Sequence, residues 1–192
     1  MKDMETTLAD GTRLAAVLPR DDRRDALVGP FQTLEDLPSG ARVGTASVRR
    51  RALLLHHRPD LDIGLLRGNV NTRIAALQDG QFDAIILAVA GLRRLGRDVD
   101  YAPLDLAVMP PSAGQGALAI QTRDRDDPRS LAVTAASADL GCAKTTTEVT
   151  AERALLGRLD GSCHTPIAAS ATCDENGRLH LCLLYTSPSP RD

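Results

Sequence analysis

The chain has 192 residues, of which 43% are hydrophobic, enough to bury one or two cores. Its formal net charge is −2 and aromatic residues make up 2% with no tryptophan, which argues against a nucleic-acid surface with base-stacking side chains. No apolar run suits a membrane span or a signal peptide, and the four cysteines lack zinc-binding spacing. We expect a protein of the reducing cytoplasm that binds no metal, nucleic acid or membrane.

The first forty residues are predicted to contain one strand and two connecting segments. Residues 12–18 follow a turn at Gly11 and have the pattern of a strand. The mixed-charge stretch 20–25 is interpreted as a solvated loop that starts a helix, and residues 30–40 as a connection between domains. These patterns alone assign no function to this part of the chain.

Residues 41–96 alternate between apolar strands and helices, which predicts an α/β unit with a parallel sheet. The expected strands are residues 42–46, 61–66 and 82–90. One helix is expected to follow an N-cap at Ser47, a second to run from an Asn71 cap to Asp79 with Gly80 after it, and a third to open with residues 91–96.

The first of these helices has an unusual charge pattern. Arg49, Arg50 and Arg51 stand in its first turn, where the helix dipole opposes each cation by roughly 0.3–1 kcal/mol. Either an anion binds there or the long side chains reach solvent, and the helix alone leaves both possibilities open. Right-handed crossovers place the helix-opening loops at one sheet edge, so further arginines should gather there, namely Arg67, Arg73, Arg93 and Arg94. Because arginine forks suit carboxylate or phosphate, we predict a pocket for a multiply anionic small molecule.

The remaining part is predicted to contain a strand, an amphipathic helix and a further strand. Residues 110–116 lack the phosphate-loop lysine, so they are interpreted as a tight interdomain turn before a strand at 117–122. Residues 147–159 carry an apolar stripe with Glu148 and Glu152 near the start of the helix. A strand is expected at 167–173.

A loop with Cys163 precedes that last strand. The cysteine stands between Gly161 and Pro166, next to His164, in a loop rather than inside a strand. Its thiolate would suit a nucleophile or an attachment point, and a structural cysteine is the alternative. His164 is not assigned as its base, because sequence neighbours rarely face each other.

Five segments and the first residues together resemble one family. They are GTASVRR at 44–50, LRGNVNTR at 66–73, DAIILAVAGLRRLG at 83–96, PSAGQGAL at 111–118 and TAERALLGRLDGSCHTPIAA at 150–169. These motifs, in this order and spacing, are similar to the hydroxymethylbilane synthase (porphobilinogen deaminase) family, and Met1-Lys2-Asp3 resembles the end of its SMKD motif.

The resemblance implies an α/β fold with two periplasmic-binding-protein-like domains and a small α+β C-terminal domain. Residues 1–18 and 113–126 would be a remnant of domain 1, residues 25–106 domain 2, and residues 138–181 part of the cofactor-attachment domain 3. Residues 182–192 match nothing in the family and are expected to be a non-native tail. Since the family has a long N-terminal part of domain 1 and a longer domain 3, we expect a fragment with little or no activity.

The resemblance also implies an activity. The family joins four porphobilinogen molecules head to tail into linear hydroxymethylbilane for tetrapyrrole and haem biosynthesis, releasing ammonia at each step, on one covalent dipyrromethane per chain. By the match, Cys163 forms the thioether to this cofactor. Asp3 matches the catalytic aspartate, where a carboxylate would move protons and stabilise the cationic azafulvene.

The resemblance further implies which side chains hold carboxylate arms. The cofactor contacts would be Lys2, Thr45, Ser47, Arg49, Arg50 and Arg73. The substrate contacts would be Arg67 and Arg94, whereas Arg51 and Arg93 are expected to be surface charges. The family suggests a monomer.

Two other classes compete with this interpretation. A non-catalytic anion-binding module of periplasmic-binding-protein type would explain the arginines but leave Asp3 and the Cys163 loop without a role. A nucleic-acid binder would explain the arginines but not the acidic balance. A transferase of the porphobilinogen deaminase type explains the arginines, Asp3 and the Cys163 loop together.

Overall fold

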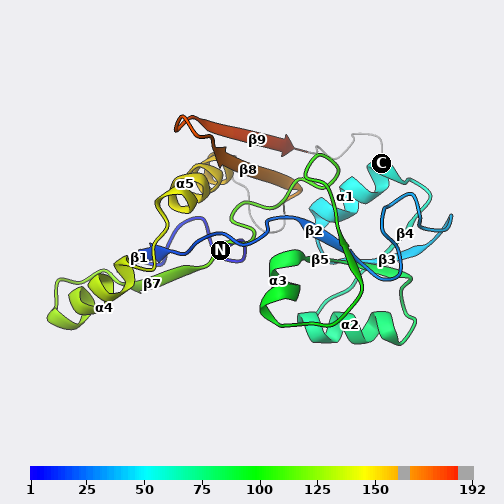
Figure 1. The fold of residues 1–192 in the computed structure, drawn as a ribbon, viewed down its shortest axis with the longest axis horizontal. Helices are drawn as coiled ribbons and strands as arrows, with labels where there is room; N and C mark the ends of the chain where they lie inside the picture. Colours follow the sequence, from blue (N-terminus) through cyan, green and yellow to red (C-terminus); the bar gives the residue numbers. More distant parts are fainter. Residues whose placement is uncertain (160–164, 186–192) are drawn as a thin grey trace.

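The computed structural model describes residues 1–159 and 165–185, which form a mixed α/β fold with three separate sheets (Figure 1). The strands are β1 (Thr12–Val17), β2 (Asp25–Val28), β3 (Arg42–Gly44), β4 (Asp62–Gly64), β5 (Ala84–Ala88), β6 (Tyr101–Pro103), β7 (Ala119–Arg123), β8 (Ile167–Cys173) and β9 (Leu179–Tyr185). The helices are α1 (Val48–His57), α2 (Val70–Gln78), α3 (Val89–Arg94), α4 (Pro128–Ala138) and α5 (Ala143–Arg158). No helix of these two stretches has both the length and the apolarity to cross a bilayer.

The largest sheet has five strands in the order β4-β3-β5-β2-β6. Strand β3 pairs in parallel with β4 and β5, as the alternation of strands and helices predicts. Strand β2 pairs antiparallel with β5 and β6, so the sheet is mixed. The prediction that residues 20–25 form a solvated loop leading into a helix was wrong, because Asp25 is fully buried and begins β2.

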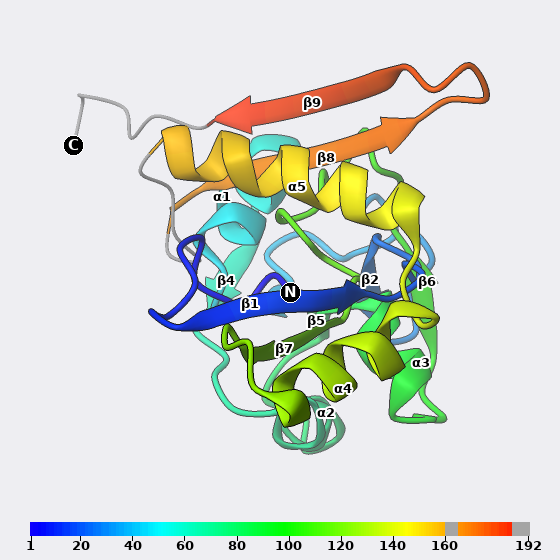
Figure 2. The same cartoon turned by 90° about the vertical axis from the view of Figure 1, so that its left-hand side faces the viewer.

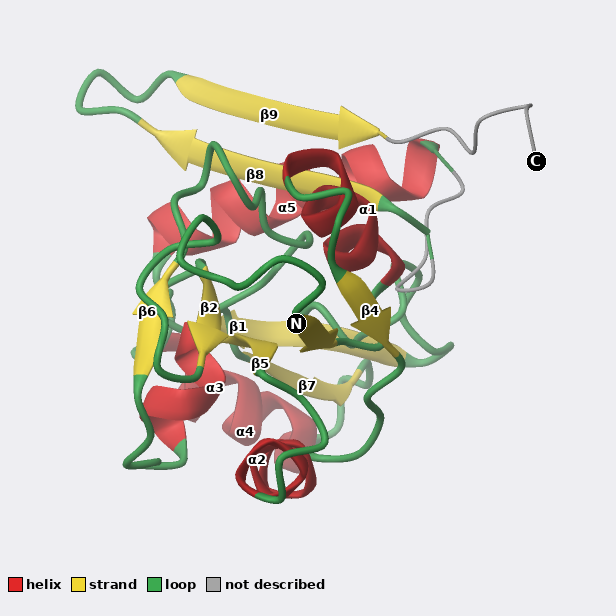
Figure 3. Cartoon of the chain, turned by 90° about the vertical axis from the view of Figure 1, so that its right-hand side faces the viewer, coloured by secondary structure: helices red, strands yellow, loops and turns green. Residues whose placement is uncertain are grey.

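Helix α1 lies on one side of this sheet and helices α2 and α3 lie on the other (Figure 3), and each side has its own hydrophobic core. On one face, Leu27 and Ile86 pack with Leu54 of α1. On the other, residues of β2 and β5 pack with α2 and α3. Leu34 and Leu37 are buried in the first core, so residues 30–40 belong to this domain and do not connect two domains as predicted.

The helix boundaries in this domain agree only in part with the predictions. Ser47 caps α1 as predicted, and its hydroxyl accepts from the backbone N–H of Arg50. The cap of α2 is Asn69, two residues before the predicted Asn71, because the Asn69 side chain accepts from Thr72 N. Strand β5 ends at Ala88 and α3 follows at once, so residues 91–96 close this helix, whereas the sequence predicted that they open it.

The rest of the chain forms two smaller units (Figure 2). Strands β1 and β7 pair antiparallel and contact α4. Strands β8 and β9 form a hairpin that packs on α5, and β8 has the predicted bounds. Residues 182–185 of the predicted tail belong to β9, and residues 186–192 lie outside the described residues.

Helix α5 differs most from its predicted pattern. It begins at Ala143, four residues before the predicted start at residue 147. Its buried side chains are Thr145, Glu148, Val149 and Glu152, so the inward face carries two carboxylates instead of an apolar stripe. This face is stabilised by ion pairs with arginines from elsewhere in the chain.

Candidate functional site

A cavity of about 270 Å³ lies where the three units meet. Its lining combines the N-terminal segment, the start of α1, Arg73 of α2, the loop at 112–113, Leu156 of α5 and Ile167 of β8. The predicted site residues that line it are Lys2, Asp3, Ser47, Arg49, Arg50 and Arg73. Side chains far apart in sequence, assigned from the motifs alone, therefore share one cavity.

The start of α1 positions two of these arginines. The Ser47 hydroxyl accepts from Arg50 N at 3.4 Å, and the Thr45 hydroxyl accepts from Ser47 N at 3.1 Å. Thr45 is buried behind Ser47 and does not line the cavity. This capped turn directs Arg49 and Arg50 inward, so the alternative that they reach solvent was wrong: both are less than 5% exposed.

An anion that belongs to the chain itself offsets part of the charge of these two arginines. Nη2 of Arg49 donates to Oδ2 of Asp25 at 2.6 Å, and Nη2 of Arg50 donates to Oδ1 of Asp25 at 2.6 Å. Burial by itself would raise the pKa of Asp25, but Arg50 and Arg49 outweigh burial and hold this pKa well below its usual range. Asp25 is therefore an ionised carboxylate between two guanidinium groups.

The two arginines differ in what else they contact. Arg49 donates to Ser112 Oγ at 3.1 Å and also to the Pro110 carbonyl. Nη1 of Arg50 donates to the Ile86 carbonyl at 3.0 Å, whereas its Nε is buried and has no hydrogen-bond partner within residues 1–159 and 165–185. A buried donor without a partner is costly, so the hydrogen-bonding capacity of Arg50 is not fully used in this structure.

Gln115 connects Asp25 with the N-terminal segment. Its Nε2 donates to Asp25 Oδ1 and to the Arg23 carbonyl, both at 2.8 Å, and its Oε1 accepts from Lys2 Nζ at 3.4 Å. The pKa of Lys2 is lowered to about 8, mainly by burial and then by the charge of Arg50. A cationic group near its midpoint at neutral to mildly basic pH thus stands beside the arginine pair.

Asp3 and Arg73 complete the polar lining. Asp3 is exposed, and its carboxylate partly offsets the lowering of the Arg73 pKa that burial and Arg50 cause. Nε of Arg73 donates to the Gly68 carbonyl at 2.9 Å, which keeps this guanidinium at the start of α2. The cavity therefore presents one carboxylate close to several cations.

The structure does not bring every predicted residue into the cavity. Arg67 is exposed and lies outside the lining. Arg94 donates to the Gly116 carbonyl at 2.7 Å, also outside the lining. The predicted attachment residue Cys163 lies outside the described residues. Arg51 and Arg93 are exposed, as expected for surface charges, and Arg93 pairs with Asp21 and Asp22 at 3.5 Å.

Sequence reasoning missed Asp25, Gln115 and Ser112. A partial signal for Asp25 existed, because the first turn of α1 carries three arginines and no acidic residue, so any carboxylate that pairs with them has to come from elsewhere. Asp25 directly precedes the apolar run at 26–28, where burial is expected. Ser112 and Gln115 lie within the PSAGQGAL motif at 111–118, but no local pattern assigns either of them a role.

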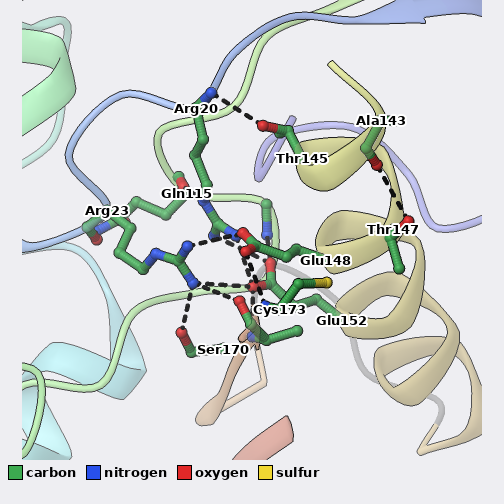
Figure 4. A network of polar contacts seen from close by, with 12 residues as sticks. Arg20, Arg23, Gln115, Ala143, Thr145, Thr147, Glu148, Glu152, Ser170 and Cys173 are labelled. Carbon is green, nitrogen blue, oxygen red and sulfur yellow. Dashed lines mark hydrogen bonds and ion pairs between the residues drawn. The ribbon is translucent and has the colours of Figure 1, made fainter. Parts of the chain in front are cut away.

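Figure 4 shows a second polar network. Its arginine and glutamate side chains do not line the cavity. Arg20 makes a two-pronged contact with Glu152 at 2.8 and 3.1 Å, and Arg23 pairs with Glu148 at 2.8 Å. Backbone N–H groups of Gly114 and Ala171 donate to Glu152 at 2.7 Å. This network fastens α5 and β8 to the segments that connect the other two units.

Metal chemistry has no candidate site in the part of the chain that the structure describes. No three histidine, cysteine, aspartate or glutamate side chains come together there in a way that would hold an ion. The polar side chains that line the cavity are cations, the exposed Asp3 carboxylate and hydroxyl groups such as those of Ser47 and Ser112.

Comparison with known proteins gives consistent matches. Family models described as porphobilinogen deaminase, dipyromethane cofactor binding domain, and porphobilinogen deaminase, C-terminal domain, match residues 1–130 and 146–189. The porphobilinogen deaminase of Phenylobacterium zucineum is 49% identical over 98% of this chain, and that of Nitrobacter hamburgensis is 47% identical over 97% of it. The chain spans 58% of the length of each. Among solved structures, YhfZ from Shigella flexneri matches 79% of this chain and 66% of its own with a TM-score of 0.33 at 15% identity, too low to inform the fold.

Proposed function

Because the chain belongs to the porphobilinogen deaminase family, we propose that its cavity serves the hydroxymethylbilane synthase reaction. The substrate is porphobilinogen, and the cofactor is a dipyrromethane attached through Cys163. The observation that carries this proposal is the cavity itself, which joins Lys2 and Asp3 to the arginines of α1 and α2.

The cavity residues fit a cofactor and a substrate that both carry carboxylate arms. Lys2, Arg49, Arg50 and Arg73 supply four cations, and Asp3 and Asp25 supply two carboxylates, which leaves a net charge of +2 while Lys2 is protonated. The unpartnered Nε of Arg50 is a donor that a ligand carboxylate would satisfy. Lys2, Ser47, Arg49, Arg50 and Arg73 would hold these arms.

The chain's own groups have distinct tasks in this proposal. When bound, the dipyrromethane supplies a pyrrole carbon to which the first substrate is joined. The cations bind and orient the acetate and propionate arms of porphobilinogen. The Asp3 carboxylate stabilises the positive charge that develops on the substrate as ammonia leaves, and accepts or returns a proton at the pyrrole nitrogen. Thr45 acts indirectly, through its bond to Ser47.

The proposal extends to the domain layout. The pairing of β1 with β7 in a separate sheet supports residues 1–18 and 113–126 as one unit, and the five-stranded sheet supports residues 25–106 as another. The hairpin of β8 and β9 on α5 supports a third unit that begins near residue 138. The periplasmic-binding-protein-like character of the first two units and the roles of Arg67 and Arg94 in substrate binding remain part of this proposal.

Intact mass spectrometry of the denatured protein tests the proposed function. After incubation with porphobilinogen, we expect an added mass of two pyrrole units on the unaltered chain and none on a Cys163→Ala variant. A Cys173→Ala variant is a matched control that should keep the adduct, because Cys173 lies in β8. An unaltered chain without the adduct, or an adduct that survives in Cys163→Ala, would contradict the proposal.

A further inference from the structure

Asp25 stands out among the groups of the cavity region because it touches the arginines and does not line the cavity. It is fully buried, and each of its carboxylate oxygens accepts from a different guanidinium group at 2.6 Å. Oδ1 also accepts from Gln115 at 2.8 Å. A ligand in the cavity therefore meets Arg49 and Arg50, and Asp25 stands behind them.

Contacts within the protein hold the guanidinium groups of both Arg49 and Arg50 in place. An arginine side chain has several rotatable bonds, so an unrestrained guanidinium loses conformational freedom when it binds a carboxylate. Here Asp25 and the Ile86 carbonyl hold two nitrogens of Arg50, and Asp25, Pro110 and Ser112 hold Arg49. The donors are in place before a ligand arrives.

Gln115 extends this restraint to the N-terminal segment. It is fully buried, and its amide joins Asp25 to Lys2 and to the Arg23 carbonyl. Gly116 follows in a loop so close to the connecting segment that a Cβ there would lie 2.6 Å from the Asp21 carbonyl oxygen. Asp25 and the Lys2-Asp3 segment are thus held in a fixed relation.

We propose that Asp25, together with Gln115, is a positioning residue that presents Arg49, Arg50 and Lys2 for the binding of ligand carboxylates. This role rests on the proposed function, because it names what sets the affinity of the same cavity. Asp25 itself contacts no ligand and acts through the arginines.

The Asp25→Asn variant tests this role, because the change in charge and the loss of positioning have opposite effects on the affinity for an anion. The substitution removes one negative charge from the site, so simple attraction would tighten the binding of an anion. If Asp25 acts by positioning, the arginines lose their alignment and binding weakens. If Asp25 only stabilises the fold, the folded fraction falls but the affinity of the folded molecules does not change.

The experiment is isothermal titration calorimetry of the whole chain at pH 7, with the folded fraction measured by circular dichroism. One probe is a pyrrole with acetate and propionate arms but no aminomethyl group, which binds without reacting, and the other is glutarate. We expect Asp25→Asn to weaken binding about tenfold, as for the loss of a charge-assisted hydrogen bond. Tighter or unchanged binding overturns the role.

Glu148→Gln is the matched control. Glu148 is also a buried carboxylate paired with arginine, and its partners Arg20, Arg23 and Cys173 lie outside the cavity lining. It should bind both probes within twofold of the unaltered chain. An equal weakening in Glu148→Gln would show that any lost buried carboxylate has this effect and would overturn the specific role.

A second variant decides the question if Asp25→Asn does not fold. Gln115→Met keeps the side-chain length and all ion pairs but removes the amide between Asp25 and Lys2, and we expect binding about threefold weaker. Unchanged binding overturns the role. If the unaltered chain binds glutarate but not the pyrrole, the proposed function is contradicted. The positioning role of Asp25 is then tested by comparing how the variants bind glutarate. A chain that binds neither probe overturns both.

Discussion

The chain contains two buried networks of arginine and carboxylate that differ in charge balance. Around Asp25, two guanidinium groups share one carboxylate, and the Nε of Arg50 lacks a partner within the described chain. Around Glu152, two arginines meet two glutamates, and no buried side-chain nitrogen or oxygen of these four residues is without a partner among residues 1–159 and 165–185. The arginines of the first network line the cavity of about 270 Å³, and those of the second network do not.

This difference shows how arginine and carboxylate side chains can serve either to stabilise a fold or to form a binding site. A balanced network with every buried atom bonded has no capacity left for a ligand, so it contributes to the orientation of α5 and β8. An unbalanced network retains positive charge, and the proposed function uses this charge to bind a second anion at the cavity. Charge balance, more than the number of arginines, thus separates a structural network from a binding site.

The largest effect should come from breaking the balanced network. A Glu152→Gln variant leaves Arg20 buried without its two-pronged partner, and we expect the free energy of unfolding to fall by about 3–5 kcal/mol. Urea unfolding measures this loss. The exposed Glu175→Gln control should unfold like the unaltered chain. A Glu152→Gln variant as stable as that control would show that the Arg20 contact contributes nothing.

A smaller effect is expected from the unbalanced network, as a loss of stability at acidic pH that depends on Asp25. Because the folded-state pKa of Asp25 is held below its unfolded value, its contribution to stability is present above about pH 4 and is lost as the pH falls below it. Because the unfolded state binds one more proton than the folded state in this range, the free energy of unfolding falls more steeply, by up to about 1.4 kcal/mol per pH unit.

Urea unfolding of the unaltered chain and of Asp25→Asn at a series of pH values measures this difference. The unaltered chain should lose stability more steeply below pH 4, whereas the two should change in parallel between pH 5 and 7. Parallel curves over the whole range would mean that Asp25 does not titrate differently in the folded and unfolded states.

Local pattern was enough to predict the α/β unit but not the two networks. The alternation of apolar runs and helices located β3, β4 and β5, and the clearest of these runs forms β5, which is buried on both faces. The charged stretch at 20–25 was predicted to be solvated, because the partners of its buried charges lie elsewhere. Those of Arg20 and Arg23 are more than a hundred residues away in α5, and those of Asp25 lie on α1. Burial of a charge depends on such distant partners, so no local pattern reveals it.

The candidate site shows the same division. The family motifs located Lys2, Asp3 and the arginines that line the cavity. They did not find Asp25, because its role depends on contact with Arg49 and Arg50, which follow it by about 25 residues and lie on another element. A helix start with several arginines and no acidic residue was the one sequence feature that called for such a partner.

The smallest expected effect compares two helix caps, one at the cavity and one away from it. Ser47→Ala and Asn69→Ala each remove a side-chain acceptor from the first turn of a helix, and each should lower the free energy of unfolding by about 1 kcal/mol. Only Ser47 lines the cavity, and its cap bond reaches the backbone of Arg50. Calorimetry with the unreactive pyrrole should therefore show weaker binding by Ser47→Ala and unchanged binding by Asn69→Ala. Unchanged binding by Ser47→Ala would mean that neither the capped turn nor a contact from the Ser47 hydroxyl contributes to holding the ligand.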